Sequence, residues 1–222
     1  TAVVVERIKN VSDWFSVKAV EIKDNPAIAL LSYVSGAVER SFYRHVRAQG
    51  LSPKAVKETG KNIKIVYTSL HGTGYTPVTT VLSKMGIKAE VVQEQIPFDG
   101  NFPTVEVPNP EDKRALAMGI ALAEKIKADV VFGTDPDCDR LGVAVRNDKN
   151  EFVGLTGNQV GILLLDYVLS RLAQTKKLPA NAAVVKSFVS TNLAKAVCDS
   201  YGVKLYETPV GFKFIGEKIK QF

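Results

Sequence analysis

Cysteine is scarce in this chain of 222 residues, which contains only Cys138 and Cys198. Neither belongs to a CxxC motif, and two thiols in a chain of this length do not build a disulfide framework. The opening segment, TAVVVERIKN, lacks the apolar region of a signal peptide. We therefore expect reduced thiols and a cytoplasmic protein.

Long apolar runs and runs of basic residues are missing too. The longest apolar stretches, such as residues 161–169 (GILLLDYVL), are too short to span a bilayer, so no membrane partner is expected. Arginine-rich segments are absent, which argues against a nucleic acid partner. Lysine and arginine number 29 against 23 acidic residues, and this net charge of +6 suits anionic partners such as phosphate esters.

Apolar residues make up 45% of the chain, and after residue 62 they alternate between strand-like and helix-like patterns. Residues 51–62 are predicted to be a polar connection. Strands are predicted at residues 63–70, 88–94, 129–133, 141–147, 182–188 and 203–207. Helices are predicted at residues 26–49, 77–86, 111–128, 155–174 and 190–202, with another opening at 208–213. This order predicts an α/β protein with two consecutive units and largely parallel sheets.

Three aspartates stand at alternate positions directly after the strand predicted at residues 129–133. They are Asp135, Asp137 and Asp139, and Arg140 follows at once. Because like charges this close repel, a fold that keeps them together needs a counter-charge. Alternate carboxylates can converge on one hard cation such as Mg²⁺, and ligands of open α/β sheets bind at the carboxyl ends of strands.

Other interpretations fit parts of this loop. An EF-hand shares the D-x-D-x-D opening, but Arg140 and Arg146 replace the glycine and glutamate that it requires. A dehalogenase-like phosphatase would use Asp135 as nucleophile within D-x-D-x-[TV], although Asp139 stands where Thr or Val belongs. A solvated acidic turn is less favoured, because a second predicted strand follows immediately. The phosphatase therefore stays open as an alternative.

The glycine-rich segment LHGTGYTP (residues 70–77) follows the first strand of this alternation. It could form a phosphate-binding nest, but it lacks the Lys-Ser/Thr ending of a P-loop. We interpret His71 as a structural turn residue rather than a catalytic base. We interpret Cys138 as a packing residue, because its spacing directs it away from the side that the aspartates share.

Residues 133–145, GTDPDCDRLGVAV, resemble the metal loop of the α-D-phosphohexomutases, the phosphoglucomutase/phosphomannomutase superfamily, whose usual form is D-G-D-G-D-R. LHGTGY, DGNFPTVEVPNPE and LTGNQVGILLLDYVL also resemble segments of this family. The resemblance implies two α/β/α domains with mixed, largely parallel sheets, the second incomplete, in a piece of a longer protein. It implies a preceding domain's tail and linker at residues 1–22, the metal-binding second domain at 23–150 and part of the third domain at 151–222.

The resemblance also implies roles for the aspartate loop. Asp135, Asp137 and Asp139 would bind Mg²⁺, and Asp139 and Arg140 would contact the substrate. A guanidinium beside a metal site can hold an anionic oxygen through two hydrogen bonds.

A second implied substrate site lies at residues 208–213, TPVGFK, which are similar to a T-P-T-G-W-K-like loop that touches the sugar phosphate in the family. Val210, Gly211 and Lys213 are the implied contacts. A helix start suits an anion because its N–H groups and dipole favour negative charge. Val210 stands where Thr is common, so a backbone contact can survive there but a hydroxyl contact cannot.

The implied activity is phosphoryl exchange between a phosphoserine and a sugar monophosphate through a sugar bisphosphate. The substrate would be a glucose, mannose or pentose phosphate. No serine here lies in the family's T-A-S-H-N-P-like loop, so we predict no catalytic residue in this chain and no activity by it alone. A non-catalytic module that binds Mg²⁺ or a sugar phosphate is a further alternative.

Overall fold

The computed structural model describes residues 2–19 and 31–222 and divides the chain into two compact units, residues 1–41 and 42–222. The first unit contains helix α1 (Ala2–Lys9) and the short 3-10 helix η1 (Trp14–Ser16). Within the described residues, no helix is both long enough and apolar enough to cross a membrane.

Helix α2 (Gly36–Ala48) begins later than predicted. The Ser35 carbonyl accepts hydrogen bonds from the N–H groups of Val38 and Glu39, so Ser35 stands at the start of the helix. Residues 31–35 are not helical, and the predicted helical residues 26–30 lie outside the described part. The predicted domain boundary at residue 22 also falls outside it.

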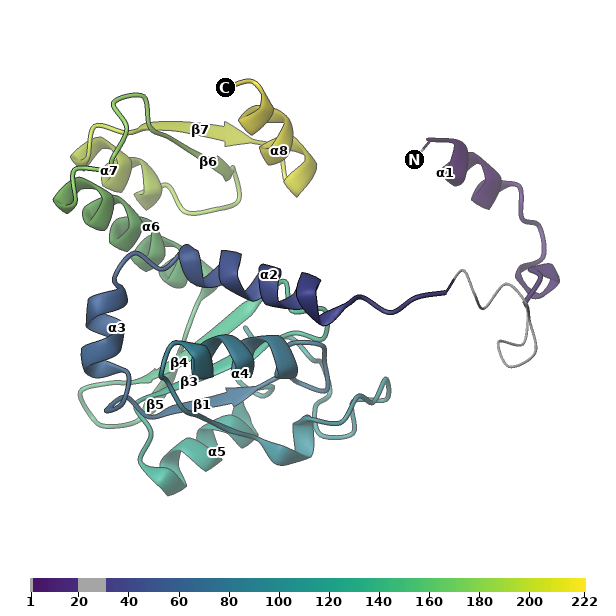
Figure 1. Cartoon of the computed structure of the whole chain (residues 1–222), viewed down its shortest axis with the longest axis horizontal. Coiled ribbons are helices and arrows are strands. Elements are labelled where there is room, and N and C mark those ends of the chain that lie inside the picture. The colour runs from purple at the N-terminus through teal and green to yellow at the C-terminus, as the bar shows by residue number, and fades with distance from the viewer. Residues whose placement is uncertain (1, 20–30) are drawn as a thin grey trace. The chain divides into compact units, whose positions relative to one another are not determined.

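A five-stranded sheet in the order β2-β1-β3-β4-β5 carries most of the core of the second unit. Figure 1 labels four of its strands, β1, β3, β4 and β5. β1 runs parallel to β2 and β3, whereas β4 runs antiparallel to both β3 and β5. The predicted α/β class with mixed pairing is therefore confirmed. The strands are β1 (Ile65–Thr68), β2 (Ala89–Val91), β3 (Val130–Thr134), β4 (Leu141–Arg146) and β5 (Phe152–Leu155).

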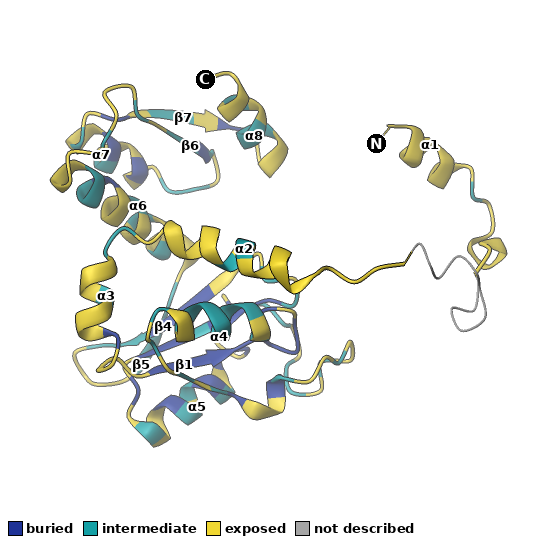
Figure 2. Ribbon diagram, viewed as in Figure 1, coloured by how far each residue is buried: buried dark blue, intermediate teal, exposed yellow. Residues whose placement is uncertain are grey.

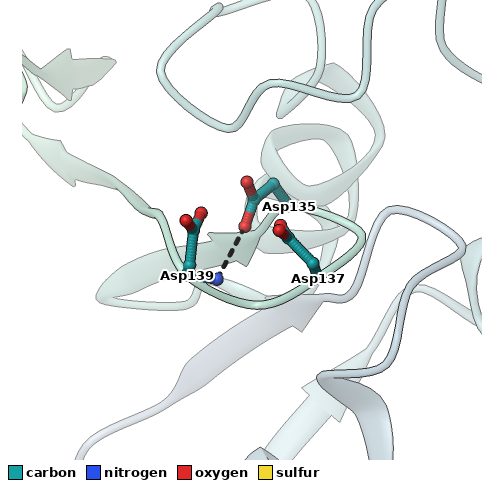
Figure 3. A group of neighbouring side chains, drawn as sticks. All are labelled: Asp135, Asp137 and Asp139. Carbon is teal, nitrogen blue, oxygen red and sulfur yellow. Dashed lines mark hydrogen bonds between the residues drawn. The ribbon is translucent and has the colours of Figure 1, made fainter. Parts of the chain in front are cut away.

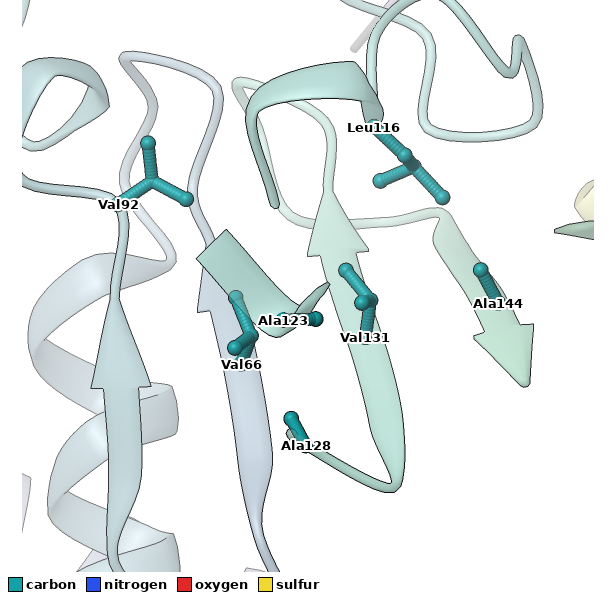
Figure 4. Close-up of a cluster of buried hydrophobic side chains, with 7 residues drawn as sticks. All are labelled: Val66, Val92, Leu116, Ala123, Ala128, Val131 and Ala144. Atoms are coloured by element: carbon teal, nitrogen blue, oxygen red, sulfur yellow. The ribbon is translucent and has the colours of Figure 1, made fainter. Parts of the chain in front are cut away.

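The two faces of this sheet are both apolar, as expected for strands covered on both sides. Val66, Val131 and Ala144 point to one face, where they pack with Leu116 and Ala123 beside helix α5 (Ala117–Ile126) (Figure 4). The preceding residue of each strand points to the other face. There the cluster consists of Ile65, Val130 and Val143, with Val160 packed against it. The buried residues accordingly concentrate in the strands (Figure 2).

Helix α4 (Tyr75–Lys84) follows β1 and contains Pro77 in its first turn, as predicted. The segment predicted to be a polar connection contains helix α3 (Pro53–Thr59), so that prediction is wrong. The helix predicted at 111–128 begins six residues late, at Ala117. Side chains before it form turns, because Asn109 Oδ1 accepts the Glu111 N–H and Asp112 Oδ1 accepts the Arg114 N–H.

A second, two-stranded parallel sheet follows helix α6 (Gly157–Gln174). Thr156 caps this helix in a capping box with Gln159. Leu169, Cys198 and Val203 form the buried cluster of this part. Its elements are β6 (Ala183–Ser187), α7 (Leu193–Ser200), β7 (Lys204–Thr208) and α8 (Phe212–Lys220).

Candidate metal centre

The three aspartates lie in the turn that connects β3 to β4 (Figure 3). The two strands form an antiparallel hairpin, in which Thr134 pairs with Leu141 and residues 135–140 form the turn. Cys138 adopts a left-handed φ of 62°, and its N–H donates to the Asp135 carbonyl over 3.0 Å. This turn brings one carboxylate oxygen from each of the three aspartates within 4.8 Å of the other two.

Asp135 is fully buried and is the fixed member of the group. Its Oδ1 accepts the N–H groups of Asp139 and Arg140 over 3.0 Å each, and its Oδ2 accepts the Arg140 Nε–H over 2.7 Å. Burial pushes the pKa of Asp135 up, but the hydrogen bonds from Arg140 outweigh it and hold that pKa below the ordinary value. Arg140 thus supplies the counter-charge that the loop needs.

Asp137 and Asp139 are exposed, and their carboxylates face the same space as that of Asp135 (Figure 3). The neighbouring Asp135 carboxylate and the charge of Asp137 raise the pKa of Asp139, although Arg140 partly opposes them. Three carboxylates held this close form a site of strong negative potential. Such a site attracts a cation.

The residues of the turn fit a divalent cation with oxygen ligands. A carboxylate offers about four lone-pair positions, and three N–H donors occupy three of those of Asp135. One position on Oδ2 is left over, and Asp137 and Asp139 can turn their exposed carboxylates toward the same point. This donor set suits Mg²⁺, which prefers a few carboxylates and completes its shell with water or phosphate.

The sequence matches the domain described as "Phosphoglucomutase/phosphomannomutase, alpha/beta/alpha domain II" over residues 40–154 and domain III of the same series over residues 156–222. The chain belongs to the phosphoglucomutase/phosphomannomutase family. The resemblance read from the aspartate loop is therefore confirmed.

Individual members of the phosphoglucomutase/phosphomannomutase family are similar along most of the chain. A phosphomannomutase of Mycoplasmoides pirum is 35% identical over 219 residues, which are 98% of this chain and 38% of that protein. A phosphoglucomutase of Staphylococcus epidermidis is 37% identical over 86% of this chain and 34% of that protein. The structure of a putative phosphomannomutase from Thermus thermophilus superimposes with a TM-score of 0.62 at 25% identity, covering 82% of this chain and 38% of that one. The chain thus spans little more than a third of these relatives.

The second segment that resembles a family loop, residues 208–213, lies between β7 and α8. Gly211 precedes the helix with φ +126°, a conformation that favours glycine. Val210 is exposed, and the Lys213 Nζ lies 4.7 Å from the ring centroid of Phe214. The substrate contacts assigned to Val210, Gly211 and Lys213 stay predictions.

Four N–H groups of the segment LHGTGY bind protein acceptors, so these four are not available to an anion. Those of Leu70, His71, Gly72 and Thr73 donate to Thr68 Oγ1 and to the carbonyls of Gln95, Ser69 and Pro136, respectively. His71 is buried, with Nδ1 bonded to the Pro97 carbonyl and Nε2 to the Thr104 hydroxyl. The prediction that His71 is structural is confirmed.

Cys138 also behaves as a packing residue. Its sulfur lies 3.0 Å from the position that a Cβ on Gly74 would occupy, beside the hydroxyls of Tyr67 and Thr134. These two hydroxyls form a buried hydrogen bond of 2.8 Å, and burial raises the pKa of Tyr67.

Proposed function

We propose that Asp135, Asp137 and Asp139 bind Mg²⁺ and that this chain is the metal-binding portion of a sugar-phosphate mutase. The whole enzyme would interconvert sugar 1-phosphate and 6-phosphate, or pentose 1- and 5-phosphate, through a phosphoserine and a sugar bisphosphate. The observation that carries the proposal is the convergence of three carboxylate oxygens within 4.8 Å at the carboxyl end of β3. Family membership supplies the reaction class.

Arg140 would hold the substrate beside this metal site. Its Nε–H is committed to Asp135, which fixes the plane of the guanidinium. The terminal nitrogens keep N–H groups for an anionic oxygen, and the side chain is 53% exposed. Bound Mg²⁺ would offset the negative charge of the phosphoryl group during transfer. A phosphate or sugar hydroxyl in contact with Asp139 and Arg140 would be positioned next to the bound cation.

Residues 208–213 would bind the phosphate of the sugar. Gly211 exposes backbone at the start of α8, and Lys213 lies within the first turn of that helix. N–H groups at a helix start favour an anion, and the lysine adds a positive charge. Val210 would contribute its backbone only, since its side chain has no hydroxyl.

The phosphatase alternative requires Asp135 to attack phosphorus. Both of its oxygens accept hydrogen bonds and the side chain is fully buried, which lowers its nucleophilicity and its access to a substrate. Incubation with a phosphoryl donor, followed by mass spectrometry, would reveal an aspartyl phosphate. Its detection on Asp135 would favour the phosphatase over the mutase.

Mn²⁺ binding, followed by electron paramagnetic resonance, tests the metal site directly. We expect weak but saturable binding by the chain and at least a tenfold loss in Asp137→Asn. Asp148→Asn is the matched control, because Asp148 is an exposed aspartate in the next hairpin turn. Equal binding by Asp137→Asn and the control would refute the metal assignment.

We also propose that the chain alone has no mutase activity, because it contains no serine in the family's catalytic context. A coupled assay with glucose 1-phosphate, Mg²⁺ and glucose 1,6-bisphosphate should stay at background. Turnover that Asp139→Ala abolishes would show that the chain contains a phosphoryl acceptor of its own.

A further inference from the structure

The aspartate turn is held by hydrogen bonds within the turn and by contacts from a neighbouring loop. Its internal hydrogen bonds act on Asp135, Asp139 and Arg140. Pro136, which joins the first two proposed ligands, is held by the loop after β1. The Pro136 carbonyl accepts the Thr73 N–H over 2.8 Å and the Thr73 hydroxyl over 3.1 Å. This carbonyl belongs to the peptide that leads into Asp137, so these two bonds fix the backbone that carries Asp137.

Gly72 completes this contact. A Cβ at Gly72 would collide with the backbone of Pro136, at its Cα and at its carbonyl. Gly72 does not have a positive φ, so the requirement for glycine here is steric rather than conformational. The two loop backbones therefore pack directly against each other, and only the absence of a side chain at residue 72 permits it.

The loop that carries these residues is itself rigidly held. Leu70 and His71 both adopt left-handed φ angles, 47° and 64°, which L-residues rarely do consecutively. A buried network supports this conformation. The His71 ring is bonded at both nitrogens, the Thr104 hydroxyl that it contacts also accepts Gln95 Nε2, and Gln95 Oε1 accepts the Thr68 hydroxyl.

We propose that Thr73 and Gly72 are positioning residues for the metal site, which hold Asp137 in register with Asp135. The buried Asp135 is fixed by its own hydrogen bonds, whereas the Asp137 side chain is exposed and depends on its backbone for its position. This inference rests on the proposed metal site. It adds that the loop after β1 sets the affinity of that site without touching the metal.

The inference is tested by measuring, for the whole chain and its variants, both the Mn²⁺ affinity and the midpoint of thermal unfolding. We expect Gly72→Ala to weaken Mn²⁺ binding about tenfold, because the added Cβ must displace Pro136. Gly100→Ala is the matched control, since a Cβ there meets nothing within 4 Å. Thr73→Val keeps the N–H but loses the hydroxyl donor and should weaken binding about threefold. Thr73→Ser, which retains both donors, should bind as the unsubstituted chain does.

The outcomes separate this inference from the proposed function. If Asp137→Asn loses Mn²⁺ while Gly72→Ala and Thr73→Val keep it, the metal site stands and the positioning role is refuted. If the unsubstituted chain binds no Mn²⁺, both proposals fail together. A purely structural role would lower the unfolding midpoint in Thr73→Val but leave its Mn²⁺ affinity equal to that of Thr73→Ser, which would also overturn the positioning role.

Discussion

The turn at residues 135–140 and the loop at residues 208–213 both follow the carboxyl end of a strand, yet they are built differently. The first has a buried carboxylate with three N–H donors and a neighbouring loop packed against it. The second exposes Val210 and Phe212 and begins its helix with a glycine at φ +126°. The difference suits their proposed ligands: a small cation needs ligands held in place, whereas a phosphate on a flexible sugar tolerates a backbone that adjusts.

Substitution of Asp135 should have the largest effect on stability. Asp135→Ala removes the acceptor of two backbone N–H groups and the partner of Arg140, and we expect a loss of about 2–3 kcal/mol in unfolding free energy. Urea unfolding followed by circular dichroism measures it, because the single tryptophan, Trp14, lies in the other unit. A loss below that of the surface control Asp148→Ala would contradict the rigid description of this turn.

Substitution of Gly211 should have the second-largest effect on stability. Gly211→Ala places an L-residue in a conformation that costs about 1–3 kcal/mol, although the exposed loop can relax and recover part of this. We therefore expect a smaller loss of stability than for Asp135→Ala, together with weaker binding of a sugar phosphate. Gly216→Ala, within helix α8 where a Cβ meets nothing within 4 Å, is the control. A larger loss than for Asp135→Ala would reverse the comparison.

Metal affinity should depend on pH through Asp139. Its pKa is raised above the ordinary value of an aspartate, so on acidification a proton competes with the metal earlier than it would at an ordinary aspartate. Mn²⁺ affinity should therefore rise with pH through the pKa of Asp139 and level off above it. The pKa of Asp135 is lowered, so the stability from its ionised form persists to lower pH and is lost only as the pH falls through that value. Mn²⁺ titrations between pH 4 and 7 measure how the metal affinity depends on pH, and an affinity that does not change with pH would contradict the role of Asp139.

Lys213 should matter least for folding. Its side chain is on the first turn of α8 and contacts the Phe214 ring, so we expect Lys213→Ala to change the unfolding free energy by less than about 0.5 kcal/mol. The same variant should weaken binding of glucose 1-phosphate, measured by calorimetry. Retained binding would remove Lys213 from the proposed site.

Periodicity predicted the strands and helices that have a clear apolar pattern. It failed at α3, where Pro53 opens a helix whose residues are largely exposed and so carry no apolar stripe. It also missed β5, a four-residue edge strand interrupted by Gly154. At four residues, all of them partly buried, this strand is too short for an alternating pattern to stand out. As a result, residues 152–155, which the sequence analysis assigned to the third domain, pair with β4.

The proposed metal ligands could be predicted because their spacing is local. The contact between Thr73 and Pro136 could not, because these residues are 63 positions apart and nothing in either segment specifies its partner. The role of Arg140 as the counter-charge could not be predicted either, because the sequence assigned Arg140 to the substrate and only the geometry identifies Asp135 as its partner. Sequence thus shows which groups can bind a metal and leaves open what holds them there.

The reversal of chain direction between β3 and β4 has a consequence for the order of folding. A hairpin closes a short loop, which takes microseconds, whereas joining Thr73 to Pro136 must close a loop of 63 residues. We expect the hairpin to bring the three aspartates together early in folding, and the contact between Thr73 and Pro136 to form late. Thr73→Val should then accelerate unfolding and leave the refolding rate unchanged, while substitutions in the hairpin should slow refolding. The chain would in this way bring its cation-binding groups together before it acquires the contact that holds them in place.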